Sequence, residues 1–161
     1  MRFLDFKQQF SDFNVITFQD IQNAFGRVNQ SQLIAWKKKK YIASARKGMY
    51  IMKDHEIDNF LLANEMNDSY ISLEFALSHY QIIPEITPSI TSVSNSRNEE
   101  IENHLGNFYY YKVAPKLFCG FVLMESSIWK GRFTRIAEKE KALFDLIYFR
   151  KDLKTDEDFA S

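Results

Sequence analysis

The sequence has few of the residues that mark secreted, fibrous or membrane proteins. A single cysteine, Cys119, excludes an internal disulfide, so a reducing compartment is expected. Five glycines and three prolines are too few for a collagen-like or low-complexity chain. The opening MRFLDFKQQF lacks the apolar core of a secretion signal. The apolar stretch FCGFVLM is far shorter than the roughly 20 residues that span a bilayer. These absences predict a soluble, cytoplasmic protein without a membrane partner.

Signatures of catalysis are also missing from the sequence. It contains no glycine-rich phosphate loop, no cysteine or histidine pair at metal-ligand spacing and no Gly-x-Ser-x-Gly motif. The histidines at positions 55, 79 and 104 are scattered, which is more typical of surface or hydrogen-bonded residues than of ligands. The lone Cys119 is expected to be a buried residue within a strand. We therefore expect neither an enzyme nor a bound metal or cofactor.

One acidic cluster leaves an enzymatic alternative open. Glu138, Glu140 and Lys141 could form a metal site, in which case Glu140→Gln would abolish activity. A structural role is the simpler interpretation, because Lys141 is spaced to pair with Glu138 and Asp145 on a helix whose first turn favours acidic residues. Asp145 lies within an apolar run. We expect it to bond a backbone group or Lys141, since an unpaired buried carboxylate is costly.

The chain does have abundant apolar bulk and strongly segregated charge. Hydrophobic residues make up 45% and aromatic residues 16% of its 161 residues, enough for one domain or two small ones. Its 21 basic and 21 acidic side chains cancel, but residues 1–53 hold ten basic and three acidic ones, or +7. Residues 54–161 hold 11 and 18, or −7. Such asymmetry favours nucleic-acid contact by the basic part; chance segregation of surface charge is the alternative.

The basic third has the periodicity of three helices followed by a hairpin. Thr17 is expected to cap the second helix, Gly26 to end it, and Gly48 to supply the positive φ of the hairpin turn. This order is typical of a winged helix-turn-helix, in which the third helix enters the DNA major groove. The expected elements are helices over residues 2–10, 18–25 and 30–39 and strands over residues 41–45 and 49–52.

Residue types suited to DNA occupy the predicted contact positions. Asparagine and glutamine at the start of the third helix can each bond adenine through two hydrogen bonds. Basic residues at the end of that helix and at the hairpin tip are expected to contact phosphates or the minor groove. The alternative is that the run KKKK merely solvates a helix end and complements its dipole. The candidate DNA-binding residues are Asn29, Gln30, Ser31, Gln32, Lys37, Lys38, Arg46 and Lys47.

The acidic two-thirds predicts a mixed α/β domain. A linking helix is expected over residues 54–69, the α/β domain over residues 70–150 and an acidic tail over residues 151–161. Within the domain, Ser72 is expected to cap a helix. A helix is expected over residues 137–150, and its end, ALFDLIYF, is apolar nearly all round and should be buried. Strands are expected over residues 89–94, 108–113, 118–124 and 133–136, with a hairpin turn at 104–107. The fold class is therefore α+β, an N-terminal winged helix-turn-helix followed by a mixed α/β C-terminal domain.

Four stretches together resemble the AbiEi-type antitoxin family of type IV toxin–antitoxin systems. In order, they are KKKKYIASARKGMYIM, SYISLEFALSHYQIIPE, GNFYYYKVAPKLFCGF and IAEKEKALFDLIYF. They match the family's basic helix end and wing, its Ser-Tyr-Ile-Ser-Leu helix, its Gly-x-Phe-x-Tyr strand and its Glu-Lys-Ala-Leu-x-Asp-Leu helix. Lys40 stands where the family usually has glycine, and Glu138 and Lys139 where it usually has Thr-Pro. Longer relatives continue beyond the last helix.

The resemblance implies a winged-helix repressor that binds inverted repeats in its own promoter. It also implies an antitoxin that counters a nucleotidyltransferase-like toxin encoded alongside, with the second domain supporting both roles. Two half-sites make a dimer on DNA plausible, although the sequence has no heptad or dimer stripe. The alternative function is a protein–protein interaction module whose winged helix does not read DNA and whose acidic domain binds a toxin or regulator.

Overall fold

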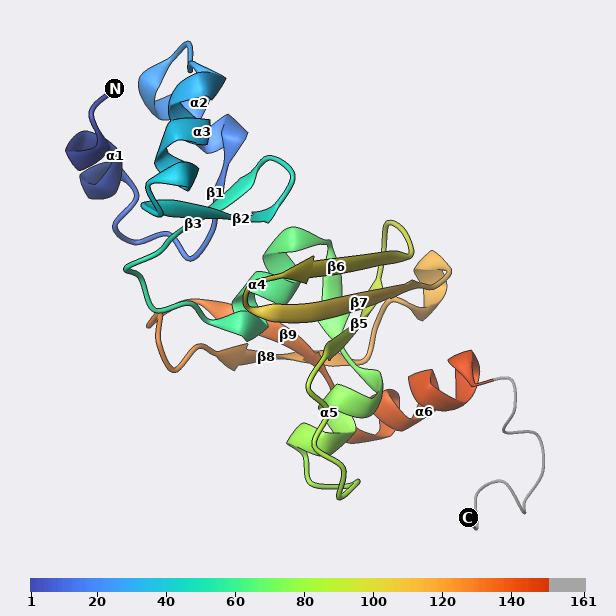
Figure 1. The fold of residues 1–161 in the computed structure, drawn as a ribbon. Helices are drawn as coiled ribbons and strands as arrows, with labels where there is room; N and C mark the ends of the chain where they lie inside the picture. Colours follow the sequence, from blue (N-terminus) through green and yellow to red (C-terminus); the bar gives the residue numbers. More distant parts are fainter. Residues whose placement is uncertain (151–161) are drawn as a thin grey trace.

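The computed structural model describes residues 1–150, so the predicted acidic tail over residues 151–161 lies outside the described part. It contains helices and two separate sheets, which confirms the mixed α+β class (Figure 1). The first unit is a three-stranded antiparallel sheet of order β1-β3-β2 with three helices. Its elements are α1 (Phe3–Gln9), β1 (Ile16–Thr17), α2 (Phe18–Phe25), α3 (Gln30–Lys38), β2 (Ile42–Arg46) and β3 (Met49–Met52).

Local sequence signals place the helix ends of this unit as expected. The Thr17 hydroxyl accepts a hydrogen bond from the Asp20 N–H at 3.1 Å, and the Asp20 carboxylate accepts one from the Thr17 N–H at 2.8 Å. This reciprocal capping box starts α2. Gly26, with φ of 72°, ends α2, and Gly48, with φ of 78°, turns the hairpin, both as predicted. The two-residue strand β1 was not predicted, because it is too short to show alternation.

An aromatic core holds the three helices on the sheet. Phe6 and Phe10 of α1 are buried, and the Phe6 ring lies edge-on to Trp36 of α3 at 5.1 Å between centroids. Ile21 of α2 and Leu33 of α3 complete the contact. Edge-on aromatic pairs of this kind add about 0.5–1.5 kcal/mol beyond simple burial. The side of α3 that carries Leu33 and Trp36 is therefore fixed inward.

The second unit is a six-stranded sheet of order β6-β7-β5-β4-β9-β8. Helix α4 covers one face, and α5 with α6 covers the other (Figure 1). The pairs β4–β9 and β5–β7 are parallel, and the other pairs are antiparallel. The elements are α4 (Asn59–Met66), β4 (Ser69–Ile71), α5 (Leu73–His79), β5 (Ile90–Ser94), β6 (Glu99–Asn103), β7 (Gly106–Lys112), the 3-10 turn η1 (Pro115–Leu117), β8 (Phe121–Glu125), β9 (Phe133–Ala137) and α6 (Lys139–Phe149).

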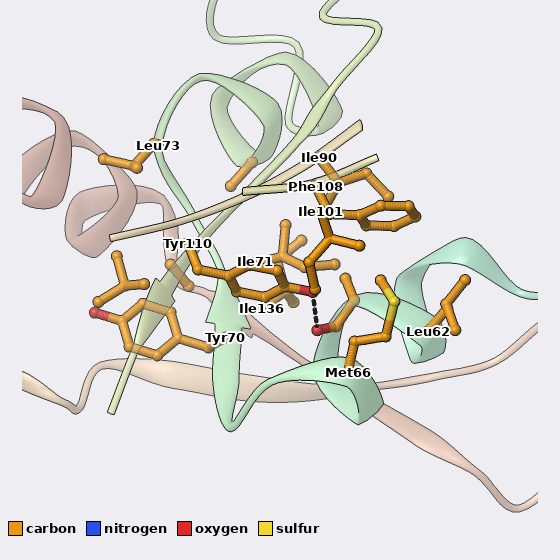
Figure 2. Packing of buried hydrophobic residues seen from close by; sticks show 14 of the residues in the cluster. Leu62, Met66, Tyr70, Ile71, Leu73, Ile90, Ile101, Phe108, Tyr110 and Ile136 are labelled. Carbon is orange, nitrogen blue, oxygen red and sulfur yellow. Dashed lines mark hydrogen bonds between the residues drawn. The ribbon is translucent and has the colours of Figure 1, made fainter. Parts of the chain in front are cut away.

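Part of the core of this unit lies between α4 and the sheet. Figure 2 shows Leu62 and Met66 of α4 beside Ile71, Phe108 and Tyr110 of the strands. The buried Tyr110 hydroxyl donates to the Ala63 carbonyl at 2.7 Å, so this polar atom is satisfied. The short strand β4 is central and entirely buried, and it was not predicted because its three residues show no alternation.

Two expectations about burial are wrong. Cys119 is exposed and lies in the link between η1 and β8, because the strand begins two residues later than this cysteine. Helix α6 is not enclosed. Only Ala142 and Asp145 on it are fully buried, because the helix packs against α5 and β9 on one side only. The exposed apolar residues of α6 are Leu143, Phe144, Ile147 and Tyr148.

One helix start and one cap bond differ from the sequence prediction. The linking helix begins at Asn59, because the Asp58 carboxylate accepts hydrogen bonds from the Phe60 and Leu61 N–H groups. Ser72 does occupy the cap position of α5, but its side chain makes no cap bond. Its hydroxyl donates to the Asp145 carboxylate at 2.7 Å instead. A tertiary partner thus replaces the local one.

The β2–β3 hairpin belongs to both units. Ile42 and Met52 point into the first core, whereas Ala45 and Ile51 on the opposite side pack into the second. Asn103 of β6 donates a side-chain hydrogen bond to the Ala45 carbonyl at 3.1 Å. The two units are therefore joined by shared apolar packing rather than by a linker alone.

A polar cluster completes the junction. The Asn14 amide donates to Glu65 at 2.9 Å, and its carbonyl oxygen accepts from the Trp129 indole N–H at 3.1 Å. Arg132 lies 3.5 Å from the Glu65 carboxylate and donates to the Asp12 carbonyl. Burial raises the pKa of Glu65, although the Asn14 hydrogen bond and Arg132 oppose the rise.

Candidate nucleic-acid interface

Helix α3 presents a continuous outward side opposite its buried residues. Leu33 and Trp36 fix one side in the core. Ser31, Ile34 and Lys38 lie three and four residues apart on the other side, and all three are exposed. This spacing brings them onto one helical face. The first unit therefore offers a helix surface that can be set against a partner along its length.

The four residues predicted to meet base edges divide into two pairs. Gln30 and Ser31 are exposed on the first turn of α3, with side chains directed to solvent. The Asn29 side-chain oxygen instead caps the helix, accepting from the Ser31 N–H at 2.9 Å. The Gln32 side-chain amide donates to the Met1 carbonyl. Gln30 and Ser31 thus keep their side chains available, whereas Asn29 and Gln32 are engaged within the chain.

Four lysines end α3 and its following turn, and all are exposed. Lys37 and Lys38 lie in the last helical turn, as predicted. Lys40 has φ of 60°, so it occupies the left-handed conformation that ends the helix. This position is the one where the resembled family usually has glycine. A non-glycine residue there carries a conformational cost of about 1–2 kcal/mol.

The two remaining predicted residues lie next to each other at the hairpin tip but have different surroundings. Lys47 is exposed at the turn. Arg46 faces the second unit, where its guanidinium bonds both oxygens of the Glu99 carboxylate and the Met66 carbonyl. Its side chain is 19% exposed. Arg46 is thus held against the second unit in a partly buried position. Sequence proximity to Lys47 could not reveal this, because Glu99 is far away in the chain.

Two residues at this surface were not predicted from the sequence. Ile34 is 49% exposed on the outward side of α3, between Ser31 and Lys38. Arg27 is exposed before α3 and, with Val28, Asn29 and Gln30, lines a hollow of about 430 Å³. A helical wheel would have identified Ile34, because it lies outside the helix face that contains Leu33 and Trp36.

The acidic cluster considered from the sequence does not form a metal site in the described residues. Within residues 1–150, no three His, Cys, Asp or Glu side chains are close enough to hold a metal ion. Glu138 and Glu140 are exposed, and Lys141 turns away from both to bond Asp145 at 2.6 Å and the Leu117 carbonyl at 3.0 Å. The expected Lys141–Asp145 pair is confirmed. In the same part of the chain, no helix is long and apolar enough to cross a membrane.

Comparison with known proteins adds no family assignment. No protein-family model matches this chain, and no characterised protein matches it significantly in sequence.

Proposed function

We propose that this chain is a DNA-binding transcriptional regulator in which residues 1–53 form a winged helix-turn-helix. The observation that carries the proposal is the exposed side of α3, which ends in four exposed lysines. A helix held by its inner side on a small sheet, with basic residues at its end, suits the geometry by which such helices enter the major groove. The β2–β3 hairpin supplies the wing.

Each exposed residue has a role suited to its chemistry. Gln30 reads a base edge, and Ile34 contacts the methyl group of a thymine. Lys37 and Lys38 bind phosphates, and Lys47 at the hairpin tip binds a flanking phosphate. Arg46 contributes indirectly, by holding the hairpin against the second unit.

The charge distribution supports this orientation on DNA. Residues 1–53 carry +7 and the remainder carries −7. Phosphate attracts the first unit and repels the second, so the second unit is left facing away from the duplex. This separation fits a regulator whose acidic domain contacts protein rather than DNA.

Binding to the chain's own promoter across a salt series tests the proposal. The logarithm of the binding constant should fall linearly with the logarithm of salt concentration. Replacing Lys37 and Lys38 with alanine should reduce that slope by about 2 and weaken all sequences alike. Gln30→Ala should cost about 1–3 kcal/mol at one base position. Replacement of the exposed Lys112 and Lys116 in the second unit is the matched control and should change neither quantity. Salt-independent binding would refute the proposal.

We further propose that the regulator is an autorepressing antitoxin that acts on promoter inverted repeats. The support is the resemblance of four ordered stretches to the AbiEi-type family, and the implied partner is a nucleotidyltransferase-like toxin. Expression of the adjacent gene should arrest growth, and co-expression of this chain should restore it. Lys37 and Lys38 substitutions should abolish repression but not rescue, if rescue belongs to the second unit. If co-expression of this chain does not restore growth, the antitoxin proposal is wrong and the chain is a regulator without a toxin partner.

A second candidate function is a protein–protein interaction module that does not read DNA. The observation that favours it is the exposed apolar side of α6, with Phe144 and Tyr148 each 48% exposed. Exposed apolar patches of this kind often mark contacts between proteins. Retention of the adjacent gene's product on the immobilised chain, lost in Phe144→Gln and accompanied by no DNA binding, would favour this function over the first.

A further inference from the structure

Strand β8 is an open edge of the six-stranded sheet. It lies at the end of the strand order and pairs only with β9 (Figure 1). Within residues 1–150, no backbone hydrogen bond reaches its outer side. Open edges are templates for another strand, so natural proteins usually protect them with charge, proline or a bulge.

The backbone groups that point outward follow from the pairing with β9. The Gly120 carbonyl accepts from the Glu138 N–H at 2.9 Å, and the Ser126 N–H donates to the Arg132 carbonyl at 2.8 Å. Bonded pairs alternate along an antiparallel ladder, so the even-numbered residues of β8 bond β9. The N–H and C=O groups of Phe121, Leu123 and Glu125 therefore face away from the sheet.

The usual protections are missing from this strand. Its sequence, FVLME, has no proline and no lysine, and its one charge is at the end. Leu123 is 65% exposed and Val122 is 41% exposed. Phe133 on the adjacent strand is 50% exposed. An apolar open edge of this kind favours association over solvation.

We propose that β8 pairs antiparallel with β8 of a second copy of this chain, about a two-fold axis at Leu123. In this register Leu123 lies opposite Leu123 of the second copy, Val122 opposite Met124, and Phe121 opposite Glu125. Every outward N–H and C=O of the strand then has a partner. A shift by two residues leaves one residue at an end of each strand unpaired. The two sheets become one continuous sheet.

A second copy fits this edge because the edge is complementary to itself. The two-fold places apolar residues opposite apolar residues at the centre, as an isologous interface requires. It also keeps the two Glu125 carboxylates apart, by about four residues or roughly 14 Å along the strands. No charge opposes the contact between the strand centres. The inference does not depend on DNA binding, although a two-fold dimer suits an inverted repeat.

Sedimentation velocity without DNA, over a range of concentrations, tests the proposal. The wild-type chain should show a concentration-dependent dimer, and Leu123→Lys should remain a monomer. Leu4→Lys is the matched control, because Leu4 is 66% exposed on α1, and it should dimerise like the wild type. Leu123→Pro is the second variant. It removes an outward N–H while sparing the bonds to β9, and it should also be monomeric. Far-UV circular dichroism checks that each variant is folded.

Cysteine pairing tests the register. In a Cys119→Ser background, Val122→Cys and Met124→Cys chains of different mass should form a disulfide when mixed. Neither should do so alone, since only the mixed pair lies directly opposite, with Cα atoms about 4.5 Å apart. A wild-type chain that stays monomeric at all concentrations would overturn the proposal. In that case a different protein would be the candidate partner of β8. A dimer unaffected by folded Leu123→Lys and Leu123→Pro chains, or equal crosslinking in mixed and unmixed samples, would also overturn it.

Discussion

Asp145 is a charged residue at the centre of a buried network. It is 1% exposed and accepts hydrogen bonds from the Tyr70 and Ser72 hydroxyls at 2.9 and 2.7 Å. Lys141 neutralises its other oxygen. Burial, together with the Asp145 charge, raises the pKa of Tyr70, so this hydroxyl stays protonated and keeps donating. The network ties α6 to β4 and to the start of α5.

Breaking that network should destabilise the protein strongly. Asp145→Ala leaves the Lys141 ammonium without its counter-charge, and we expect a loss of about 3–5 kcal/mol in the free energy of unfolding. Glu140→Gln, on the exposed side of the same helix, is the control and should stay within about 0.5 kcal/mol. Equilibrium urea denaturation measures both. Similar values for the two variants would contradict a buried role for Asp145.

Lys40 carries the clearest local strain in the first unit, with φ of 60°. Lys40→Gly should stabilise the protein by up to about 1 kcal/mol, because glycine adopts this conformation freely. Lys39→Gly is the matched control. Its φ of −76° is ordinary for any residue, so the change should destabilise by about 0.5–1 kcal/mol. Thermal unfolding distinguishes the two, and a destabilising Lys40→Gly would rule out strain at this turn.

At the level of elements, α6 shows how an apolar sequence can be misjudged. The apolar run ALFDLIYF at its end predicts burial on all sides, yet only Ala142 and Asp145 are fully buried. The helix contacts α5 and the end of β9, which together cover one side. Composition reports the tendency of a helix to be buried, whereas the neighbours decide how much of it is covered.

This difference predicts opposite responses on the two sides of α6. Phe144→Gln should change the free energy of unfolding by no more than about 0.5 kcal/mol, since the ring is half exposed. Ala142→Leu should cost about 1–3 kcal/mol, because the extra methylenes have no room at a fully buried position. Denaturant midpoints measure both changes. A large loss in Phe144→Gln would mean that another part of the chain covers this side.

At the scale of the whole molecule, the hairpin couples the two units. Ala45 and Ile51 pack into the second core while Ile42 and Met52 pack into the first. Arg46 bonds Glu99 and Met66 across the same boundary. Because the hairpin packs into both units, a substitution that removes its contacts should lower the stability of both.

Arg46→Ala should lower the free energy of unfolding by about 1.5–3 kcal/mol, the usual range for hydrogen bonds to charged groups. The adjacent Lys47→Ala is the control and should have little effect on stability, because Lys47 is exposed. Lys47→Ala should instead weaken the binding of DNA. Urea denaturation and promoter binding, measured on both variants, separate the two roles. Equal stability of the two variants would contradict the coupling.

The junction should also make stability depend on pH. Burial raises the pKa of Glu65 above its ordinary 4.5. The folded state therefore favours the protonated form, and this contribution is present below pH 4.5 and is lost as pH rises through the folded pKa. The wild type should lose stability relative to Glu65→Gln between about pH 4 and pH 7. Urea denaturation at both values measures this difference, and Glu56→Gln controls for the loss of an exposed carboxylate. A difference that is independent of pH would contradict the prediction.

The sequence by itself determined the features that depend on near neighbours. Thr17 and Gly26 mark the ends of α2 through bonds and conformations within a few residues, and Gly48 marks the hairpin turn in the same way. The charge division at residue 53 is likewise a property of the sequence alone. The lysine run and the start of α3 are therefore recognisable as candidate contact residues from residue type and spacing.

Only the tertiary structure decided which of these side chains remain available. Gln32 is bound by Met1 and Arg46 by Glu99, and both partners are distant in the chain. Strands β1 and β4 exist because neighbouring strands satisfy their backbone groups, since two or three residues carry no periodicity of their own. The open edge at β8 is set by sheet order, which depends on long-range pairing. Local propensity fixes where elements start and stop, and packing between distant residues fixes what is left exposed.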